Sequence, residues 1–290
     1  MAKKSKLANK HGVLFNILAT ILWIWTASQI LLIFWGLLTS LRGDWAYSMK
    51  PNRFFPEGHI WEWAWGNYAE AVTTMAYNKT SYLGMIGNSV WYSIGATFMK
   101  LLATTLLAYV MAQYEFFGKK ALYTFLIIQI MLPIYGQTTA NYVLLDGMGF
   151  VDTPLFLLAL GAGHGMYFLI MHSYFVGISA TYKEAAEIDG ANDFTIFFRI
   201  MLPLGMSSVI AIGLMTFIGV WNDYQTAMLY LPSYPTLSAG LYKYQIVAKY
   251  EFSAPIFFSG IFMSALPTAV LFIVFNKTLM ENITIGGIKG

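Results

Sequence analysis

Lys100 is the one charged residue near the centre of a long apolar stretch, roughly residues 88–112. A charge at the middle of a bilayer costs at least about 2.5–3.5 kcal/mol, so we expect this lysine to face protein or a wet cavity. Two interpretations stay open. Lys100 is either a pore-facing or partner-pairing cation, or a lysine that bonds backbone carbonyls at a subunit seam or extends along a tilted helix to the surface.

Two histidines, His164 and His172, occupy another apolar stretch, roughly residues 154–177. Eight positions along a helix offset their side chains by about 80°, so they do not form a tight ligand pair. No Asp or Glu lies within the stretch, which argues against a metal site. We expect the histidines to form hydrogen bonds between helices, with contact to a solute as the less favoured alternative. The chain has no cysteine, which excludes thiolate metal sites and thiol nucleophiles.

A different chemistry is concentrated between Lys183 and Gly205, where six charged residues stand between two apolar stretches. Thr181 and Glu184 have the spacing of a capping box at the start of a short helix. Gly190 is the natural end of that helix because it tolerates a left-handed backbone. Asn192 can cap a second short helix, and Pro203 is expected to close it. The segment is too short and too charged to enter lipid.

The second short helix is expected to carry an apolar face. Phe194, Phe197, Phe198 and Met201 have the spacing i, i+3, i+4 and i+7, which is typical of one side of a helix. We expect this face to pack on the chain's own helices. Carboxylates outnumber basic side chains in the segment, so nucleic acid is not an expected partner.

The elements that position these residues are predicted from the composition. Of the 290 residues, 58% are apolar and only 11% are charged, against about 25% charged residues in soluble domains. About 20 apolar residues cross a bilayer. The predicted fold is therefore all-α, with six transmembrane helices at roughly 14–38, 88–112, 121–141, 154–177, 207–229 and 256–275. Pro133 and Pro267 fall inside two of these helices, where they are expected to produce kinks.

The distribution of basic residues predicts the orientation of the chain. The N-terminus is rich in lysine, and an uncharged run from Gly12 to Leu41 follows it. This run is too long for a cleaved secretory signal, so we interpret it as a retained span. Lysine is favoured on the inner side, which puts both termini in the cytoplasm. The longer connection, residues 42–87, is rich in Trp and Tyr and is expected to lie along the outer membrane interface.

The charged segment resembles the signature loop of permease subunits of binding-protein-dependent ABC importers. The matching positions are Glu184, Ala185, Ala186, Gly190, Ile200, Met201, Leu202 and Pro203. The end of the chain, Ile283–Gly290, is similar to that of the maltose-type carbohydrate permeases. The resemblance covers roughly residues 84–290 and implies the type I importer fold.

This resemblance implies a division into three parts. Residues 1–83 form an N-terminal cytoplasmic tail, a first transmembrane helix and the interfacial segment. Residues 84–276 form the transmembrane domain, with a cytoplasmic coupling loop at 179–206. Residues 277–290 form a cytoplasmic C-terminal tail.

The resemblance also implies the partners: a second permease, two ATPase subunits, an extracytoplasmic solute-binding protein and the lipid bilayer. The first short helix would enter a cleft on an ATPase subunit. The positions implied in this contact are Glu184, Ala185, Ala186, Asp189, Gly190, Ile200 and Pro203, with Gly286, Gly287 and Lys289 as a second contact from the tail. The chain lacks a G-x-x-x-x-G-K-[ST] phosphate loop, so ATP and Mg²⁺ are expected on the partner subunits and no cofactor in this chain.

Three alternatives are weighed against a carbohydrate importer. An importer permease for a non-sugar solute fits the loop equally well. A self-sufficient secondary transporter is disfavoured because it would need coupled carboxylates within the spans, and only Asp223 is available, near an outer end. A membrane-embedded enzyme would need a nucleophile with its base or a set of metal ligands, and the spans contain no such group.

Overall fold

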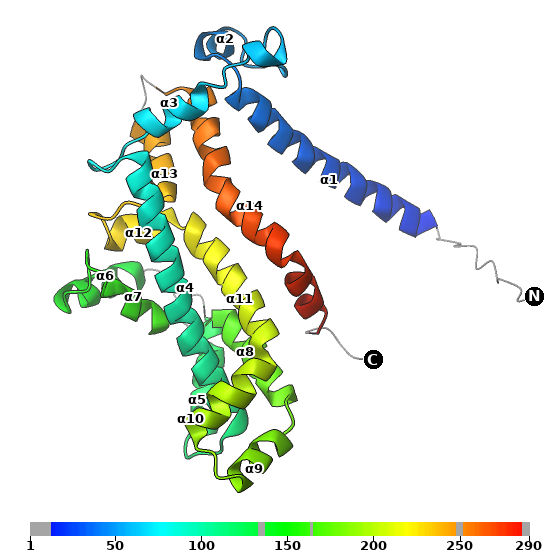
Figure 1. Cartoon of the computed structure of the whole chain (residues 1–290), viewed down its shortest axis with the longest axis vertical. Helices are drawn as coiled ribbons and strands as arrows, with labels where there is room; N and C mark the ends of the chain where they lie inside the picture. Colours follow the sequence, from blue (N-terminus) through cyan, green and yellow to red (C-terminus); the bar gives the residue numbers. More distant parts are fainter. Residues whose placement is uncertain (1–12, 133–136, 163–164, 248–251, 286–290) are drawn as a thin grey trace, which may run out of the picture. The chain divides into compact units, whose positions relative to one another are not determined.

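The computed structural model describes residues 13–132, 137–162, 165–247 and 252–285 (Figure 1). Within these ranges the chain is helical and contains no strand, which confirms the predicted all-α class. The helices divide into two compact units. The first comprises the described residues up to Ala71 together with those from 252 to Met263, and the second comprises the rest.

The first unit contains a long helix and an irregular segment after it. Helix α1 (Val13–Ser40) is followed by α2 (Asp44–Met49), by the short 3₁₀ helix η1 (Ile60–Glu62) and by the start of α3 (Asn67–Thr74). Residues 42–81 therefore contain only short helices, and the last residues of the predicted connection, 82–87, belong to the next long helix.

Arg42 organises the backbone directly after α1. Its side chain is buried, and its guanidinium donates hydrogen bonds to the carbonyls of Lys50 (2.6 Å), Arg53 (3.0 Å), Ala46 (3.1 Å) and Pro51 (3.4 Å). Burial lowers the pKa of Arg42. The sequence indicated only an outer basic residue here. The structure instead shows that the Arg42 side chain holds the following turn in place by bonding its carbonyls.

Four of the described helical segments are long and apolar enough to cross a membrane. They are Leu14–Ser40, Tyr82–Gln113, Asp193–Asn222 and Ala254–Lys277. The chain is thus a multi-pass membrane protein.

The predicted third and fourth spans are divided into shorter helices. The third contains α5 (Lys119–Met131) and the start of α6 (Gln137–Gly147). The fourth contains α7 (Phe156–Ala159), η2 (Leu160–Ala162) and α8 (Gly165–Gly177). The count of six spans therefore stays a prediction.

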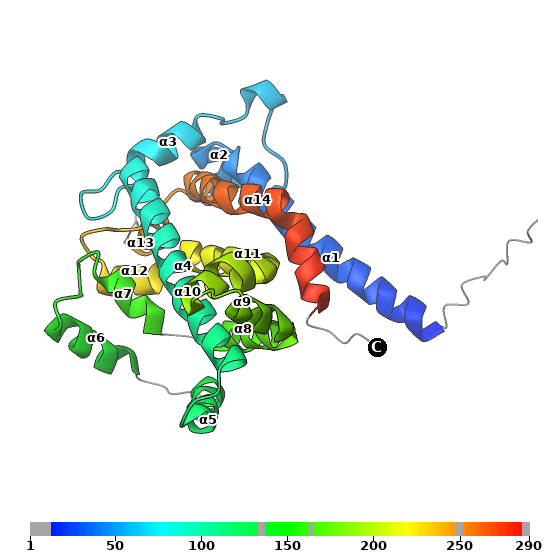
Figure 2. The same cartoon turned by 60° about the horizontal axis from the view of Figure 1, so that its bottom comes forward.

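Helix α4 (Tyr82–Gln113) is the centre of the second unit. It begins at Tyr82 rather than at residue 88, because the hydroxyl of Ser81 caps it by accepting a hydrogen bond from the Gly84 amide (3.3 Å). Helices α8 and α11 (Leu202–Asn222) both pack against it, and both Figures 1 and 2 show α11 alongside α4.

Helix α11 ends at Asn222, so the predicted fifth span, 207–229, is wrong at its end. The Asp223 carboxylate accepts a hydrogen bond from the Thr226 amide (3.0 Å) and caps a new helix, α12 (Tyr224–Tyr230). A further helix, α13 (Leu237–Val247), follows.

Two separate apolar clusters lie along α4. The first includes Tyr92 and Ala96 of α4 and packs against α7, α11 and α12. The second includes Ala108, Tyr109 and Met111, near the other end of α4, and packs against α8 and α11 among others. One turn of α4, from Lys100 to Thr104, lies between the buried residues of the two clusters, and its Leu101 packs against the second cluster.

Helix α14 (Ala254–Ile285) extends beyond the predicted sixth span and includes residues 277–285 of the predicted tail. Pro267 lies inside this helix, as expected. The indole of Trp221 donates a hydrogen bond to the Ser264 carbonyl (2.9 Å), in the turn that precedes Pro267. A proline disturbs the hydrogen bonds of that turn, and the indole supplies a donor there.

Candidate functional site

The charged segment forms the two short helices that the sequence predicts, α9 (Thr181–Ile188) and α10 (Asp193–Ile196). Figure 1 shows both at the lower end of α4. Gly190 has a φ of 79°, and the Asn192 side chain accepts a hydrogen bond from the Thr195 amide (2.8 Å). The predicted glycine corner and the predicted second cap are both confirmed.

The predicted capping box at Thr181 and Glu184 is wrong. Helix α9 has no side-chain cap from Thr181, because the turn begins two residues earlier. The hydroxyl of Ser179 accepts from the Thr181 amide (3.3 Å) and pairs with the Thr181 hydroxyl (2.8 Å). The Glu184 side chain is consequently exposed. It forms no hydrogen bond or ion pair within the part of the chain that the structure describes.

Pro203 does not close the second helix, contrary to the prediction. Helix α10 continues through a π-helical turn, η3 (Phe197–Met201), directly into α11, and Pro203 lies in the first turn of α11. The Leu202 amide bonds the Phe197 carbonyl five residues earlier. A π turn of this kind accommodates a proline, which has no amide to donate.

The predicted apolar face of the second helix is only partly correct. Phe197 and Met201 are buried together with Ile196, whereas Phe194 and Phe198 are exposed. Phe197 and Met201 belong to the same cluster as Tyr109 of α4, so the segment is built into the core.

Ala186 must also be reassigned. Its side chain is only 6% exposed and packs in that core, so it does not face a partner. Ala185, Asp189, Gly190 and Pro203 are exposed, and Ile200 is half-buried.

Several apolar side chains of these helices are exposed. Ile188 is 86% exposed and Phe194 is 76% exposed, and Tyr182 and Ala185 are exposed as well. We call these four residues the docking surface. Sequence reasoning did not find Ile188 as a contact residue, and it assigned Phe194 to the interior. The signal that was available for Ile188 was a large apolar side chain next to the glycine corner.

Tyr114, the residue after α4, connects both short helices to that helix. Its hydroxyl donates a hydrogen bond to the Asp193 carboxylate (2.7 Å), and the Lys183 amine lies 3.6 Å from the centre of its ring. The Lys183 amine also donates to the Gln113 carbonyl at the end of α4 (3.2 Å). Burial, with the hydrogen bond to Asp193, raises the pKa of Tyr114. The tyrosine therefore stays protonated as a donor.

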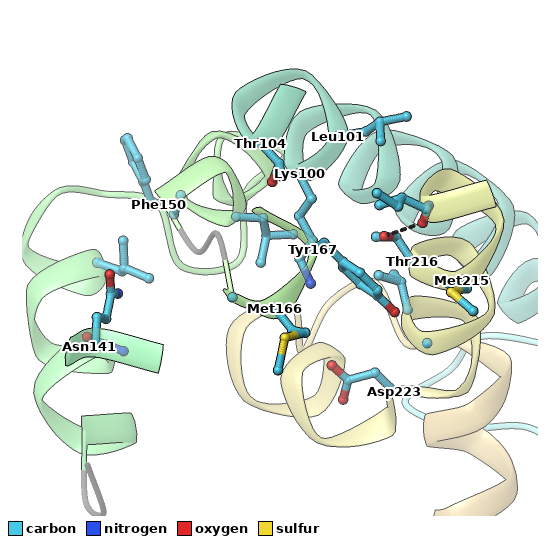
Figure 3. A pocket seen from close by; sticks show the side chains of 18 of the residues that line it. Lys100, Leu101, Thr104, Asn141, Phe150, Met166, Tyr167, Met215, Thr216 and Asp223 are labelled. Carbon is cyan, nitrogen blue, oxygen red and sulfur yellow. Dashed lines mark hydrogen bonds between the residues drawn. The ribbon is translucent and has the colours of Figure 1, made fainter. Parts of the chain in front are cut away.

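A cavity of about 1040 Å³ lies on the turn of α4 between the two clusters (Figure 3). Its walls come from α4, α5, α6, α8 and α11 among others. Lys100 points from α4 into this space, and Asp223 lies on another side. Lys100 is thus one of the predicted intramembrane residues that the structure places at a cavity.

The other intramembrane candidates have different positions. His172 interacts with the backbone of Met111 on α4 and packs at a tilted angle against Tyr123, in agreement with the predicted role between helices. It is not among the residues that line the cavity, and neither is Pro267. His164, Pro133, Gly286, Gly287 and Lys289 lie outside the described residues.

Comparison with known proteins identifies the family of the chain. Residues 104–277 match the family model for the binding-protein-dependent transport system inner membrane component. The maltodextrin transport system permease protein of Bacillus subtilis is 33% identical over 219 residues, which are 74% of this chain and 78% of the relative. The arabinooligosaccharides transport system permease protein of Halalkalibacterium halodurans is 28% identical over 72% of this chain and 75% of its own length.

A solved structure shares the fold. It belongs to a bacterial ABC transporter involved in the import of the acidic polysaccharide alginate, with a TM-score of 0.76 at 20% identity. The match covers 91% of this chain and 96% of that one. The family match covers more than half of the chain and includes the short helices, whereas Lys100 and Leu101 lie before its first residue. The chain belongs to the family of inner membrane components of binding-protein-dependent transport systems.

Proposed function

We propose that this chain is a permease subunit of an ATP-driven importer for a carbohydrate, and that its cytoplasmic short helices couple it to an ATPase subunit. The observation that carries the proposal is the docking surface, which exposes Ile188 and Phe194 on helices whose other side is buried in the core. Large exposed apolar side chains in one place are typical of a protein–protein contact. A movement of the docking surface would be transmitted to α4 through Tyr114, which contacts Asp193 of α10 and Lys183 of α9.

Carbohydrate is the solute that the relatives favour. The named relatives transport maltodextrin and arabinooligosaccharides, and they are similar to this chain over about three quarters of their length. The complete importer would contain a second permease, two ATPase subunits, an extracytoplasmic binding protein and the bilayer. ATP and Mg²⁺ would bind to the ATPase subunits, and both termini would lie in the cytoplasm.

The C-terminal tail supplies a second proposed contact with the ATPase subunits, through Gly286, Gly287 and Lys289. This proposal rests on the resemblance of the chain's end to that of the maltose-type permeases.

Reconstitution tests the proposed function. The chain is placed in vesicles with its second permease, ATPase subunits and binding protein, and uptake of labelled oligosaccharides is measured with and without ATP. We expect uptake and solute-stimulated ATP hydrolysis from the complete assembly and neither from this chain alone. Uptake by this single chain without its partners would refute the importer proposal, and a complete assembly that accepts only non-carbohydrate solutes would refute the solute class.

A further inference from the structure

We propose that the cavity at Lys100 binds the carboxylate of an acidic carbohydrate during transport. This proposal rests on the importer function proposed above and specifies the solute further.

The Lys100 amine has no direct partner among the described residues. It forms neither a hydrogen bond nor an ion pair with them, although it lies close enough to Asp223 for a Coulombic attraction. No backbone carbonyl of the described residues accepts a hydrogen bond from the Lys100 amine. A lysine kept at this depth without a partner depends on the water in the cavity to solvate it.

Asp223 lines the same cavity, but its carboxylate forms no ion pair with the Lys100 amine. One oxygen of its carboxylate accepts the hydrogen bond from Thr226 that begins α12, which holds the group at the end of α11. Lys100 instead lies on the turn of α4 between the two apolar clusters. An anion that enters beside Lys100 thus meets a cation that no described carboxylate has already paired.

The neutral walls of the cavity suit the rest of a sugar. Tyr167 offers an aromatic face, and Asn141, Gln129 and Thr104 offer side chains that can donate and accept hydrogen bonds. Lys100 and Tyr167 both line the cavity (Figure 3), so a solute in it can meet both the amine and the ring.

A fully neutral sugar would leave this site incomplete. It would displace the water that solvates the Lys100 amine and offer only hydroxyl groups in return. Burying a charged group without an ionic partner is costly, whereas a carboxylate forms a short, charge-assisted hydrogen bond with an amine. The cavity therefore favours a solute with one negative charge.

The test compares an acidic oligosaccharide with its carboxyl-reduced form, in which each carboxylate has become an alcohol. Both are offered to the complete importer in vesicles, with wild-type chain, Lys100→Gln and Lys100→Arg. We expect the wild type to take up the acidic form faster, by roughly tenfold for one charge-assisted contact. Lys100→Gln should lose this preference because uptake of the acidic form falls far more than uptake of the reduced form, and Lys100→Arg should retain most of the preference.

The outcomes separate this inference from the proposed function. All variants use the same binding protein, so a change in preference arises in the permease. ATP-dependent uptake of sugars with the same preference in wild type and Lys100→Gln would overturn the carboxylate site and leave the importer function intact. An equal loss of both sugars in Lys100→Gln would also overturn it, because it would mean that the lysine acts in structure or gating. No ATP-dependent uptake of any sugar by the wild-type assembly would overturn both proposals.

Discussion

The hydroxyl of Tyr114 donates a 2.7 Å hydrogen bond to the carboxylate of Asp193. One partner directly follows α4, which contributes Lys100 to the cavity, and the other is the first residue of α10. The same tyrosine ring lies under the Lys183 amine of α9. A single side chain therefore connects both short helices to the helix that carries Lys100.

Removing the Tyr114 hydroxyl should weaken coupling and leave the fold intact. Tyr114→Phe keeps the ring that faces Lys183 but loses the bond to Asp193. We expect the amount of solute transported per ATP to fall between about two- and tenfold, the range of one hydrogen bond. Tyr174→Phe is the matched control, because its hydroxyl bonds the Leu204 carbonyl (2.8 Å) rather than α10. An equal effect of both variants would argue for a general loss of stability instead of a coupling role.

Substitutions at Gly190 should act through the backbone conformation of the corner and not through steric clashes of the new side chain. Its φ is 79°, and a Cβ built there would meet no atom within 4 Å. Gly190→Val should therefore lose most ATPase retention in a pull-down, since the left-handed region costs an L-residue about 1–2 kcal/mol and a β-branched one more. Gly190→Asn should retain more, because asparagine tolerates this region. Full retention by the valine variant would contradict the corner's role.

The docking surface should lose its partner when Ile188 becomes polar. Ile188→Ser removes the most exposed apolar side chain of α9 and should reduce ATPase retention by at least about tenfold, as expected for a central contact. Leu83→Ser, an exposed apolar residue at the start of α4, is the control for a general effect of polarity. Retention that is unchanged in Ile188→Ser would place the ATPase contact elsewhere.

Glu184 provides a finer test of the same surface. Because no capping box forms, Glu184→Gln should leave α9 intact and change only the charge offered to a partner. We expect a modest decrease in ATPase retention that disappears at high salt, where exposed charges are screened. Glu115→Gln, at a carboxylate that pairs with Lys119, serves as the control. Unfolding of α9 in Glu184→Gln would show that the Glu184 carboxylate caps this helix after all.

Deleting residues 286–290 tests the second contact. We expect lower solute-stimulated ATP hydrolysis with normal assembly of the importer, measured by co-purification of all subunits. Wild-type stimulation after the deletion would mean that the tail does not contribute to coupling.

Arg42 should be required for the turn after α1. Arg42→Lys replaces a guanidinium that bonds four carbonyls by an amine with three donors and a different shape. We expect the free energy of unfolding to fall by about 1–3 kcal/mol, since the carbonyls around the buried guanidinium lose donors. Faster proteolysis between α2 and α3 would report this loss, with Lys50→Arg as an exposed control.

The sequence by itself determined the features that depend on neighbouring residues. Gly190 and Asn192 form the predicted corner and cap because a turn is decided by the backbone preferences and side-chain oxygens within about four residues. Charge-free stretches determined the membrane class for a similar reason, since insertion depends on the summed polarity of one segment.

Only the tertiary structure decided which side of each element is buried. Ala186 faces the core and Phe194 does not, because α9 and α10 pack on residues that lie far away in the chain, such as Tyr109. The same holds for the cavity at Lys100, whose walls come from segments between residues 100 and 223. Local spacing fixes which residues share a helix face, whereas contacts between distant segments determine what that face meets.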